Sequence, residues 1–324
     1  MNGEREAMVR GGRRDRRVRE AVELLDAGVD RILDGEEFKR YLAFAAKFHR
    51  YSANNSLLIL LQRPDATKIA GYKRWQQLGR QVQRGEEGIR ILAPIIWTVE
   101  DEESGEKARM LCSFKVVKVF DVSQTDPVPG APLIPEKPRP AALPGSSSAT
   151  RALARSLGRF CEAEGIELRE SGEELDAPYP GANGLYSPKK KLILLRGTLS
   201  DDQKAKSLTH ELAHHLLHRD ARASEAERPT LEVEAEGTAY AVLSYFGVDA
   251  SDYSFAYVAH WAEQKEAVKV VLSNIQKTAQ EIIEAVEDGA SEGKGTSGRG
   301  RRRKREARPP GSARIIRKRD GVAT

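Results

Sequence analysis

The residue pattern with the clearest chemistry is His210-Glu211-Leu212-Ala213-His214, in which two histidines stand four positions apart. On a helix, positions i and i+4 lie one turn apart on the same face, so both imidazoles can reach one Zn²⁺ ion. Glu211 stands on the adjoining flank, where its carboxylate can take a proton from water activated by the metal. The pattern predicts a catalytic zinc site with His210 and His214 as ligands and Glu211 as the general base.

A zinc site of this kind needs a third protein ligand and one open position for water. The candidates are acids of the downstream segment LEVEAEGTAYAVLSYFG. Glu236 is the first candidate, because apolar residues at i+3, i+4 and i+7 place its carboxylate on a face where burial is costly unless a cation pairs with it. Glu232, one turn earlier on nearly the same face, is the alternative. Glu234 is expected to point into solvent.

Other polar residues have less defined roles. Tyr240, Tyr257 and His260 are candidate donors for an oxyanion formed during peptide hydrolysis. His218 lies eight positions after the first histidine of the motif, which on a straight helix is about 12 Å, too far for one metal ion. We therefore expect His218 and His215 to be packing or surface residues.

Composition limits the class of protein. The chain has 324 residues, of which 40% are hydrophobic and 31% charged, which is consistent with two ordinary domains. No run of about 18 apolar residues and no signal peptide are found, so we expect a cytoplasmic protein without a membrane span. Cys112 and Cys161 cannot form a cysteine-rich zinc module and are expected to be buried free thiols.

Charge is distributed unevenly along the chain. Residues 38–93 contain 11 basic and 3 acidic residues, interleaved with aromatic residues, which suggests an anionic partner. Residues 289–324 contain 12 basic and 3 acidic residues without apolar periodicity, which indicates a disordered tail.

Hydrophobic spacing predicts an α+β protein. Helices are expected at 13–33, 37–49, 148–165, 231–245 and 254–286, and strands at 87–99, 108–122 and 192–195. A further helix begins at Ser200, where Ser200 and Gln203 match a capping box. The run 56–61 is apolar but ambiguous. Seven prolines between 126 and 145 favour a linker. The expected organisation is an N-terminal domain (1–126), the linker (127–145), a second domain (146–288) and the tail (289–324).

Four segments of the C-terminal half are similar to the ImmA/IrrE-like and ArdC-like metallopeptidases of mobile elements. They are NGLYSPKKKLILL, LTHELAHHLLH, EVEAEGTAYAVLSYFGVD and YSFAYVAHWA. The resemblance implies a small, gluzincin-like HExxH metallopeptidase fold with one zinc ion and a protein or peptide substrate. In such families a glutamate on the next helix is followed by an alanine and an aromatic residue, which here implies Glu236, Ala239 and Tyr240. Three acids crowd this segment, so the third ligand stays open between Glu236 and Glu232.

The basic segment of the N-terminal half interleaves cations with Tyr51, Tyr72 and Trp75. Such residue types suit a groove that contacts phosphates and stacks bases, and they equally suit an ordinary basic domain with aromatic core residues. No signature of a duplex-reading motif is present.

A resemblance favours the nucleic-acid interpretation. Residues 51–94 resemble the N-terminal domain of ArdC-type antirestriction proteins through Tyr-x-x-x-Asn, an apolar run, a helix with Tyr and Trp, and Leu-Gly-x-x-Val-x-x-Gly-Glu-x-Gly before a strand. The family implies binding of single-stranded DNA. The residues implied to carry this binding are Arg50, Asn54, Asn55, Lys73, Trp75, Arg80 and Arg84. Asn54 and Asn55 have the alternative role of capping a helix, and Trp75 that of a core residue.

Together these features predict a single-stranded-DNA-binding zinc metallopeptidase of antirestriction type. Two alternatives remain from the sequence: a DNA-coating antirestriction factor whose zinc ion only stabilises the fold, and a regulatory protease that cleaves a repressor. A structural zinc ion usually has four protein ligands, whereas this sequence offers three clear ones.

Overall fold

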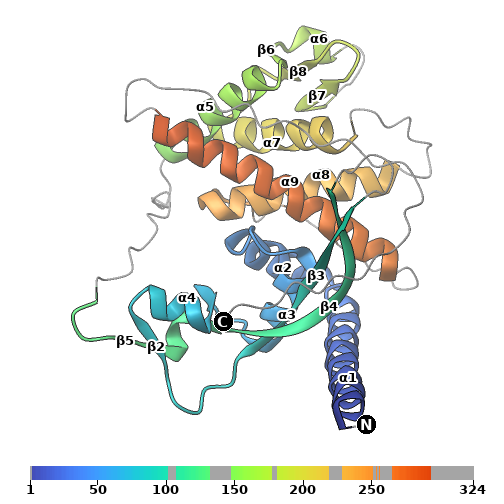
Figure 1. Cartoon of the computed structure of the whole chain (residues 1–324). Coiled ribbons are helices and arrows are strands. Elements are labelled where there is room, and N and C mark those ends of the chain that lie inside the picture. The colour runs from blue at the N-terminus through green and yellow to red at the C-terminus, as the bar shows by residue number, and fades with distance from the viewer. Residues whose placement is uncertain are drawn as a thin grey trace.

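The computed structural model describes residues 2–100, 107–131, 147–176, 181–218, 228–250, 253, 255 and 265–292, arranged as an α+β protein (Figure 1). The helices are α1 (Asn2–Arg31), α2 (Gly35–Lys47), α3 (Ala53–Gln62), α4 (Tyr72–Gln77), α5 (Ser147–Ala163), α6 (Glu173–Asp176), α7 (Asp201–His218), α8 (Arg228–Phe246) and α9 (Lys265–Glu292). The strands are β1 (Ile69–Gly71), β2 (Arg80–Val82), β3 (Ile89–Glu100), β4 (Lys107–Asp121), β5 (Thr125–Pro127), β6 (Glu167–Glu170), β7 (Gly184–Ser187) and β8 (Leu192–Leu195).

The first three helices share one hydrophobic core with the last two, and Figure 1 shows α2 and α3 beneath α8 and α9. Side chains from α1 to α3, among them Val29 and Leu57, join one cluster with Val233 of α8. Gly237 of α8 permits close packing, because a Cβ atom there would lie 2.6 Å from Cδ1 of Ile275 and 3.6 Å from Cδ1 of Leu42. The N-terminal and C-terminal halves of the chain therefore pack directly on each other.

A buried amide on α9 reinforces this packing. Gln276 is 5% exposed, and its Nε2 donates to Ser56 Oγ at 2.9 Å. The same amide nitrogen lies 3.4, 3.3 and 3.1 Å from the carbonyl oxygens of Ala45, Phe48 and Tyr51. These carbonyls follow or end α2, where helix geometry leaves backbone acceptors without intrahelical partners. One side chain of α9 thus satisfies backbone groups of the N-terminal half.

Strands β3 and β4 form a long antiparallel ribbon, with β1 on the other side of β4, so β3 is an edge strand. Two amide side chains of α3 cover that edge. Asn55 exchanges two hydrogen bonds of 2.9 Å with the backbone of Leu92. Gln62 exchanges bonds of 2.9 and 3.0 Å with the backbone of Arg90. Because exposed edges invite pairing with other strands, these amides protect the start of the ribbon.

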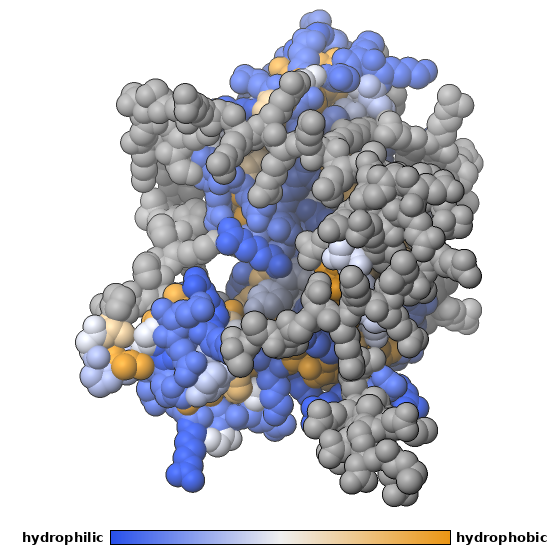
Figure 2. All heavy atoms as spheres, viewed as in Figure 1, coloured by the Kyte–Doolittle hydropathy of each residue, from blue (hydrophilic) through white to orange (hydrophobic). Residues whose placement is uncertain are grey.

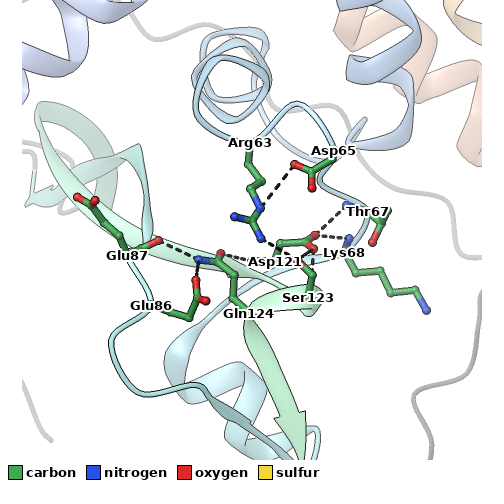
Figure 3. Close-up of polar contacts among 9 residues, drawn as sticks. All are labelled: Arg63, Asp65, Thr67, Lys68, Glu86, Glu87, Asp121, Ser123 and Gln124. Atoms are coloured by element: carbon green, nitrogen blue, oxygen red, sulfur yellow. Dashed lines mark hydrogen bonds and ion pairs between the residues drawn. The ribbon is translucent and has the colours of Figure 1, made fainter.

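A polar network closes the base of the ribbon (Figure 3). The Asp121 carboxylate accepts the backbone N–H groups of Thr67 and Lys68 at 2.8 and 3.0 Å, and both the N–H and the hydroxyl of Ser123 at 3.0 and 2.8 Å. Burial alone would raise the pKa of Asp121, but these donors hold it below its usual value. The side-chain amide of Gln124 extends the network, donating to Glu86 Oε2 at 2.7 Å and to the Glu87 carbonyl at 2.9 Å.

The C-terminal half adds a small sheet over two helices, at the top of Figure 1. β8 is the central strand, parallel to β6 and antiparallel to β7, and its four residues Leu192–Leu195 are all buried. Side chains of α5, α7, α8 and α9 form one core with this strand. The order β6-β8-β7 leaves β7 at the sheet edge, beside α7.

Most elements expected from hydrophobic spacing are confirmed, and the ambiguous run 56–61 is part of helix α3. The strands β6 and β7 were missed, β7 because it lies in a turn-rich segment. The long C-terminal helix is described from Lys265 to Glu292, and its expected start lies outside the described residues. Residues 132–145 of the expected linker and 293–324 of the expected tail also lie outside them. Across the described residues, no helix combines the length and apolar character needed to cross a membrane.

Candidate metal centre

Helix α7 carries the histidine pair. Its start is fixed by the predicted capping box: the Gln203 N–H donates to Ser200 Oγ at 3.3 Å, and the Ser200 N–H donates to Gln203 Oε1 at 3.3 Å. Leu212, inside the motif, is fully buried and holds the helix against the core. This leaves His210 and His214 on the outer face one turn apart, with their Nε2 atoms 3.0 Å from each other.

The third candidate ligand lies on α8, which packs against α7. Glu232 Oε2 lies 3.4 Å from His210 Nε2 and 3.6 Å from His214 Nε2. Zinc ligands at about 2.0–2.2 Å in a tetrahedron are roughly 3.3–3.6 Å from one another. The separations of 3.4 and 3.6 Å fall within that range and the third, 3.0 Å, is slightly shorter, so the residues present fit a divalent cation.

This geometry corrects the ranking of the two acids. Among the described residues, the group whose ligand atoms approach within 4.8 Å is His210, His214 and Glu232. Glu236 lies one turn further along α8 and outside this group, although its charge acts on His210. Glu236 is the first candidate from the sequence because apolar residues share its helix face. The acid that lies beside the two imidazoles is instead Glu232, near the start of α8, whose side chain is 55% exposed.

The electrostatics of the three side chains favour a cation between them. Hydrogen bonds to His210 and His214 hold the pKa of the Glu232 carboxyl far below its usual value. Burial would lower the pKa of His210, but the hydrogen bond to Glu232 and the charge of Glu211 raise it. Each group therefore stabilises the charged form of its neighbour, as expected for a site that binds positive charge.

Glu211 lies against the edge strand β7. Its Oε2 accepts the backbone N–H of Tyr186 at 2.7 Å. On the same strand, a Cβ atom at Gly184 would lie 3.0 Å from both Cγ and Oε1 of Glu211, so the lack of a side chain at this position permits the close approach. Burial raises the pKa of Glu211, against the lowering effect of His210 and His214, and a raised pKa makes a carboxylate a stronger base.

A cleft of about 400 Å³ runs between these elements. One wall is β7, with Gly184, Leu185 and Tyr186, and the other holds Glu211 and the three candidate ligands. This volume is within the range of small-molecule and peptide sites. A peptide segment can therefore reach the metal position and the candidate base together.

Two residues without an expected role lie directly behind the ligands. His218 Nδ1 is 3.0 Å from His214 Nδ1, and His218 Nε2 is 2.9 Å from Glu234 Oε2. Glu234 is 5% exposed, so the prediction of a solvent-facing side chain is wrong. The sequence signal for this contact is the i, i+4 spacing of His214 and His218, which places the two rings one helical turn apart.

Two family models match the chain. A model described as the N-terminal domain of anti-restriction factor ArdC matches residues 14–120, and a model described as an IrrE N-terminal-like domain matches residues 161–270. The chain combines an ArdC-type N-terminal domain with an IrrE-like domain. The IrrE-like domain contains α7, α8 and β7, and hence every residue of the metal centre described above.

The chain is also similar to a curated protein and to a solved structure. An uncharacterised protein of Bacillus anthracis, pXO2-81, is 25% identical over 295 residues, covering 79% of this chain and 49% of its own length. The chain thus spans about half of that curated relative. The crystal structure of the antirestriction ArdC protein from the R388 plasmid is 20% identical in its metal-free form, with a TM-score of 0.46 over 74% of this chain and 85% of that one. The Mn(II)-bound form has a TM-score of 0.45 at 20% identity, over 75% and 86%.

In the ArdC-type domain, three of the residues expected to bind DNA serve the fold. Trp75 is 2% exposed and donates its Nε1–H to the Phe120 carbonyl at 2.9 Å, which excludes base stacking. Asn55 is committed to the edge of β3. Arg80 is half-buried and holds β5 through Thr125 Oγ1 at 2.6 Å.

The other four expected DNA-binding residues have more accessible side chains. Lys73 and Arg84 are exposed, and Asn54 is half-buried. Arg50 is exposed and lies 3.6 Å from Glu284. Ser52, rather than either asparagine, caps α3.

Tyr240 is the one candidate oxyanion donor in the described part of the chain, and it does not line the cleft. The Tyr240 ring packs edge-on against Tyr253 and Phe255, at 6.0 and 5.8 Å between ring centroids. Tyr257 and His260 lie outside the described residues. Of the cysteines, Cys161 is buried as expected, whereas Cys112 is exposed on the ribbon.

Proposed function

We propose that this chain is a single-zinc metallopeptidase of antirestriction type that also binds single-stranded DNA. The observation that carries the peptidase proposal is the grouping of His210, His214 and Glu232 within ligand distance of one another, with Glu211 of α7 held against the facing strand β7. Three protein ligands leave a tetrahedral ion one open position, which is the arrangement of catalytic zinc sites.

The residues divide the chemistry between them. A bound zinc ion supplies Lewis acidity, which polarises a peptide carbonyl and lowers the pKa of water. The Glu211 carboxylate takes the proton of the attacking water and passes it to the nitrogen of the leaving amine. The Tyr186 N–H fixes one carboxylate oxygen of Glu211, which leaves Oε1 to exchange that proton.

The metal and the activity are tested together on purified full-length protein. We expect one zinc ion per chain and metal-dependent cleavage of an unfolded protein such as casein. Glu211→Gln should retain the metal and lose cleavage, because it removes the base and not a ligand. Cleavage that persists in this variant would refute the mechanism. A chain that binds zinc and cleaves nothing even as wild type would instead favour a structural metal.

The DNA-binding proposal rests on the ArdC-type domain and on a basic surface that we name the α4 surface: Tyr72, Lys73, Arg74 and Arg84. All four side chains are exposed, and Tyr72 is 42% exposed. The part of the molecule formed by α4 and β2 is predominantly hydrophilic on the face seen at the lower left of Figure 2. Cations beside an accessible aromatic ring are the groups that bind phosphates and stack on bases.

Fluorescence anisotropy with a labelled oligothymidylate tests this proposal. Affinity should fall as salt rises, because each phosphate contact with a cation releases counterions. Replacing Lys73 and Arg84 together by alanine should weaken binding and flatten its salt dependence. Binding that is insensitive to salt, or unchanged in this double variant, would contradict the proposal for this surface.

A further inference from the structure

Three side chains, connected in series by hydrogen bonds to His214, form a hydrogen-bonded chain that leads from the candidate metal centre into the protein core. It begins at His214, whose Nε2 faces the other ligands and whose Nδ1 lies 3.0 Å from His218 Nδ1. The far nitrogen of His218 lies 2.9 Å from Glu234 Oε2. The other oxygen of Glu234 accepts a hydrogen bond of 2.7 Å from the side-chain amide of Asn274, on α9.

If His214 binds the metal and both His214 and His218 are neutral, only one arrangement of protons satisfies this hydrogen-bonded chain. A histidine that binds a metal through Nε2 carries its proton on Nδ1. His214 therefore donates to His218, which accepts at Nδ1 and must carry its own proton on Nε2. That proton is donated to Glu234, so each donor in the chain meets an acceptor.

Glu234, the carboxylate at the end of this hydrogen-bonded chain, is buried together with His218, which strengthens the interaction between them. The side chains of His218 and Glu234 are 9% and 7% exposed. A buried carboxylate is costly unless it is paired, and it interacts more strongly with its partners than it would in water. Asn274 and His218 provide that pairing here, and the helix that holds Asn274 is anchored on the N-terminal half by Gln276.

We propose that His218 and Glu234 are positioning residues for the metal centre: they fix the tautomer and ring orientation of His214 and make its Nε2 a stronger electron donor to the metal. This inference rests on the proposed metal site. Partners that hydrogen-bond to a liganding histidine typically change metal affinity by about 10–100-fold. His210 gains no such partner from the His218–Glu234 chain, so the effect is specific to one of the two imidazoles.

The test measures affinity of the full-length chain for Zn²⁺ by competition with a chromophoric chelator, and the visible absorption of the Co²⁺-loaded protein. Glu234→Gln keeps the size of the side chain and removes its charge, and His218→Phe breaks both hydrogen bonds. We expect each variant to bind zinc about 10–100-fold more weakly and to shift the Co²⁺ bands. A matched control is Glu287→Gln, which also removes an acid between α8 and α9, where Glu287 accepts a bond of 2.5 Å from Tyr245. The control should bind zinc as tightly as wild type.

A double variant separates positioning from general stability. If the two residues act through one chain, Glu234→Gln combined with His218→Phe should weaken zinc binding little more than either change alone. Urea unfolding of the metal-free proteins reports any purely structural loss. Wild-type zinc affinity in both single variants, or losses that multiply in the double variant, would overturn the inference. Failure of the wild-type chain to bind zinc would instead count against the proposed function itself.

Discussion

Gly184 offers a sharp test of how the candidate base is held. Its Cα is so close to Glu211 that an alanine Cβ would lie 3.0 Å from Cγ and Oε1 and 3.3 Å from Cδ. Ordinary carbon contacts are about 3.5–4.0 Å, so Glu211 must retreat by about half an ångström. That shift strains its 2.7 Å bond with the Tyr186 N–H. A misplacement of about 1 Å can cost about 100-fold in rate, so we expect Gly184→Ala to lower kcat/KM roughly tenfold.

The assay is cleavage of an unfolded protein substrate by the zinc-loaded chain, with zinc content and affinity measured in parallel. Because the three atoms nearest to a Cβ at Gly184 all belong to Glu211 and none to a candidate ligand, zinc affinity should stay at the wild-type value. The control is Gly197→Ala, where a Cβ atom would meet nothing within 4 Å. Unchanged kcat/KM in Gly184→Ala, or equal losses in the two variants, would refute the reasoning that links β7 to Glu211.

Three further predictions concern the other sites. Glu232→Ala should weaken zinc binding by more than about 100-fold, which exceeds the effect of residues that only hydrogen-bond to a ligand. Glu236→Ala should bind zinc nearly as tightly as wild type. Titration of each variant with zinc in competition with a chelator measures the difference. Trp75→Phe should cost about 1–3 kcal/mol of stability in urea unfolding, through a small cavity and the unpaired Phe120 carbonyl, and leave DNA affinity unchanged in anisotropy. Asp121→Asn should cost about 3 kcal/mol at pH 7, because two or more charge-assisted bonds are lost. Because the folded-state pKa of Asp121 is lowered, its carboxylate contributes its full stabilisation above the pKa of the unfolded state, about 3.9, and loses it as the pH falls further. Between pH 5 and pH 2, Asp121→Asn should therefore lose less stability than wild type.

Local patterns predicted local structure well. Ser200 and Gln203 mark the first turn of α7 because a capping box needs only neighbouring residues. The three leucines and one isoleucine of β8 form an uninterrupted apolar run, which predicts a strand buried on both faces. The histidine pair could be assigned to one ion because its spacing is a property of the helix itself.

What the sequence could not provide is the position of one helix against another. Glu232 and Glu236 are one turn apart on α8, and only the crossing of α7 and α8 brings the first within reach of the imidazoles. The same limit applies to Glu234, which meets His218 across that crossing. It applies again to Asn55, whose amide pairs with a strand 37 residues away.

The packing of the two halves has a consequence for the metal site. Glu232 is on α8, and α8 lies between α2 of the ArdC-type domain and α9. Gly237, just over one turn after Glu232, allows that close approach, since a side chain there would collide with Ile275. The candidate ligand is thus carried by a helix that packs on the N-terminal half. We therefore expect the ArdC-type domain to stabilise the geometry of the proposed metal centre, in addition to carrying the proposed DNA surface.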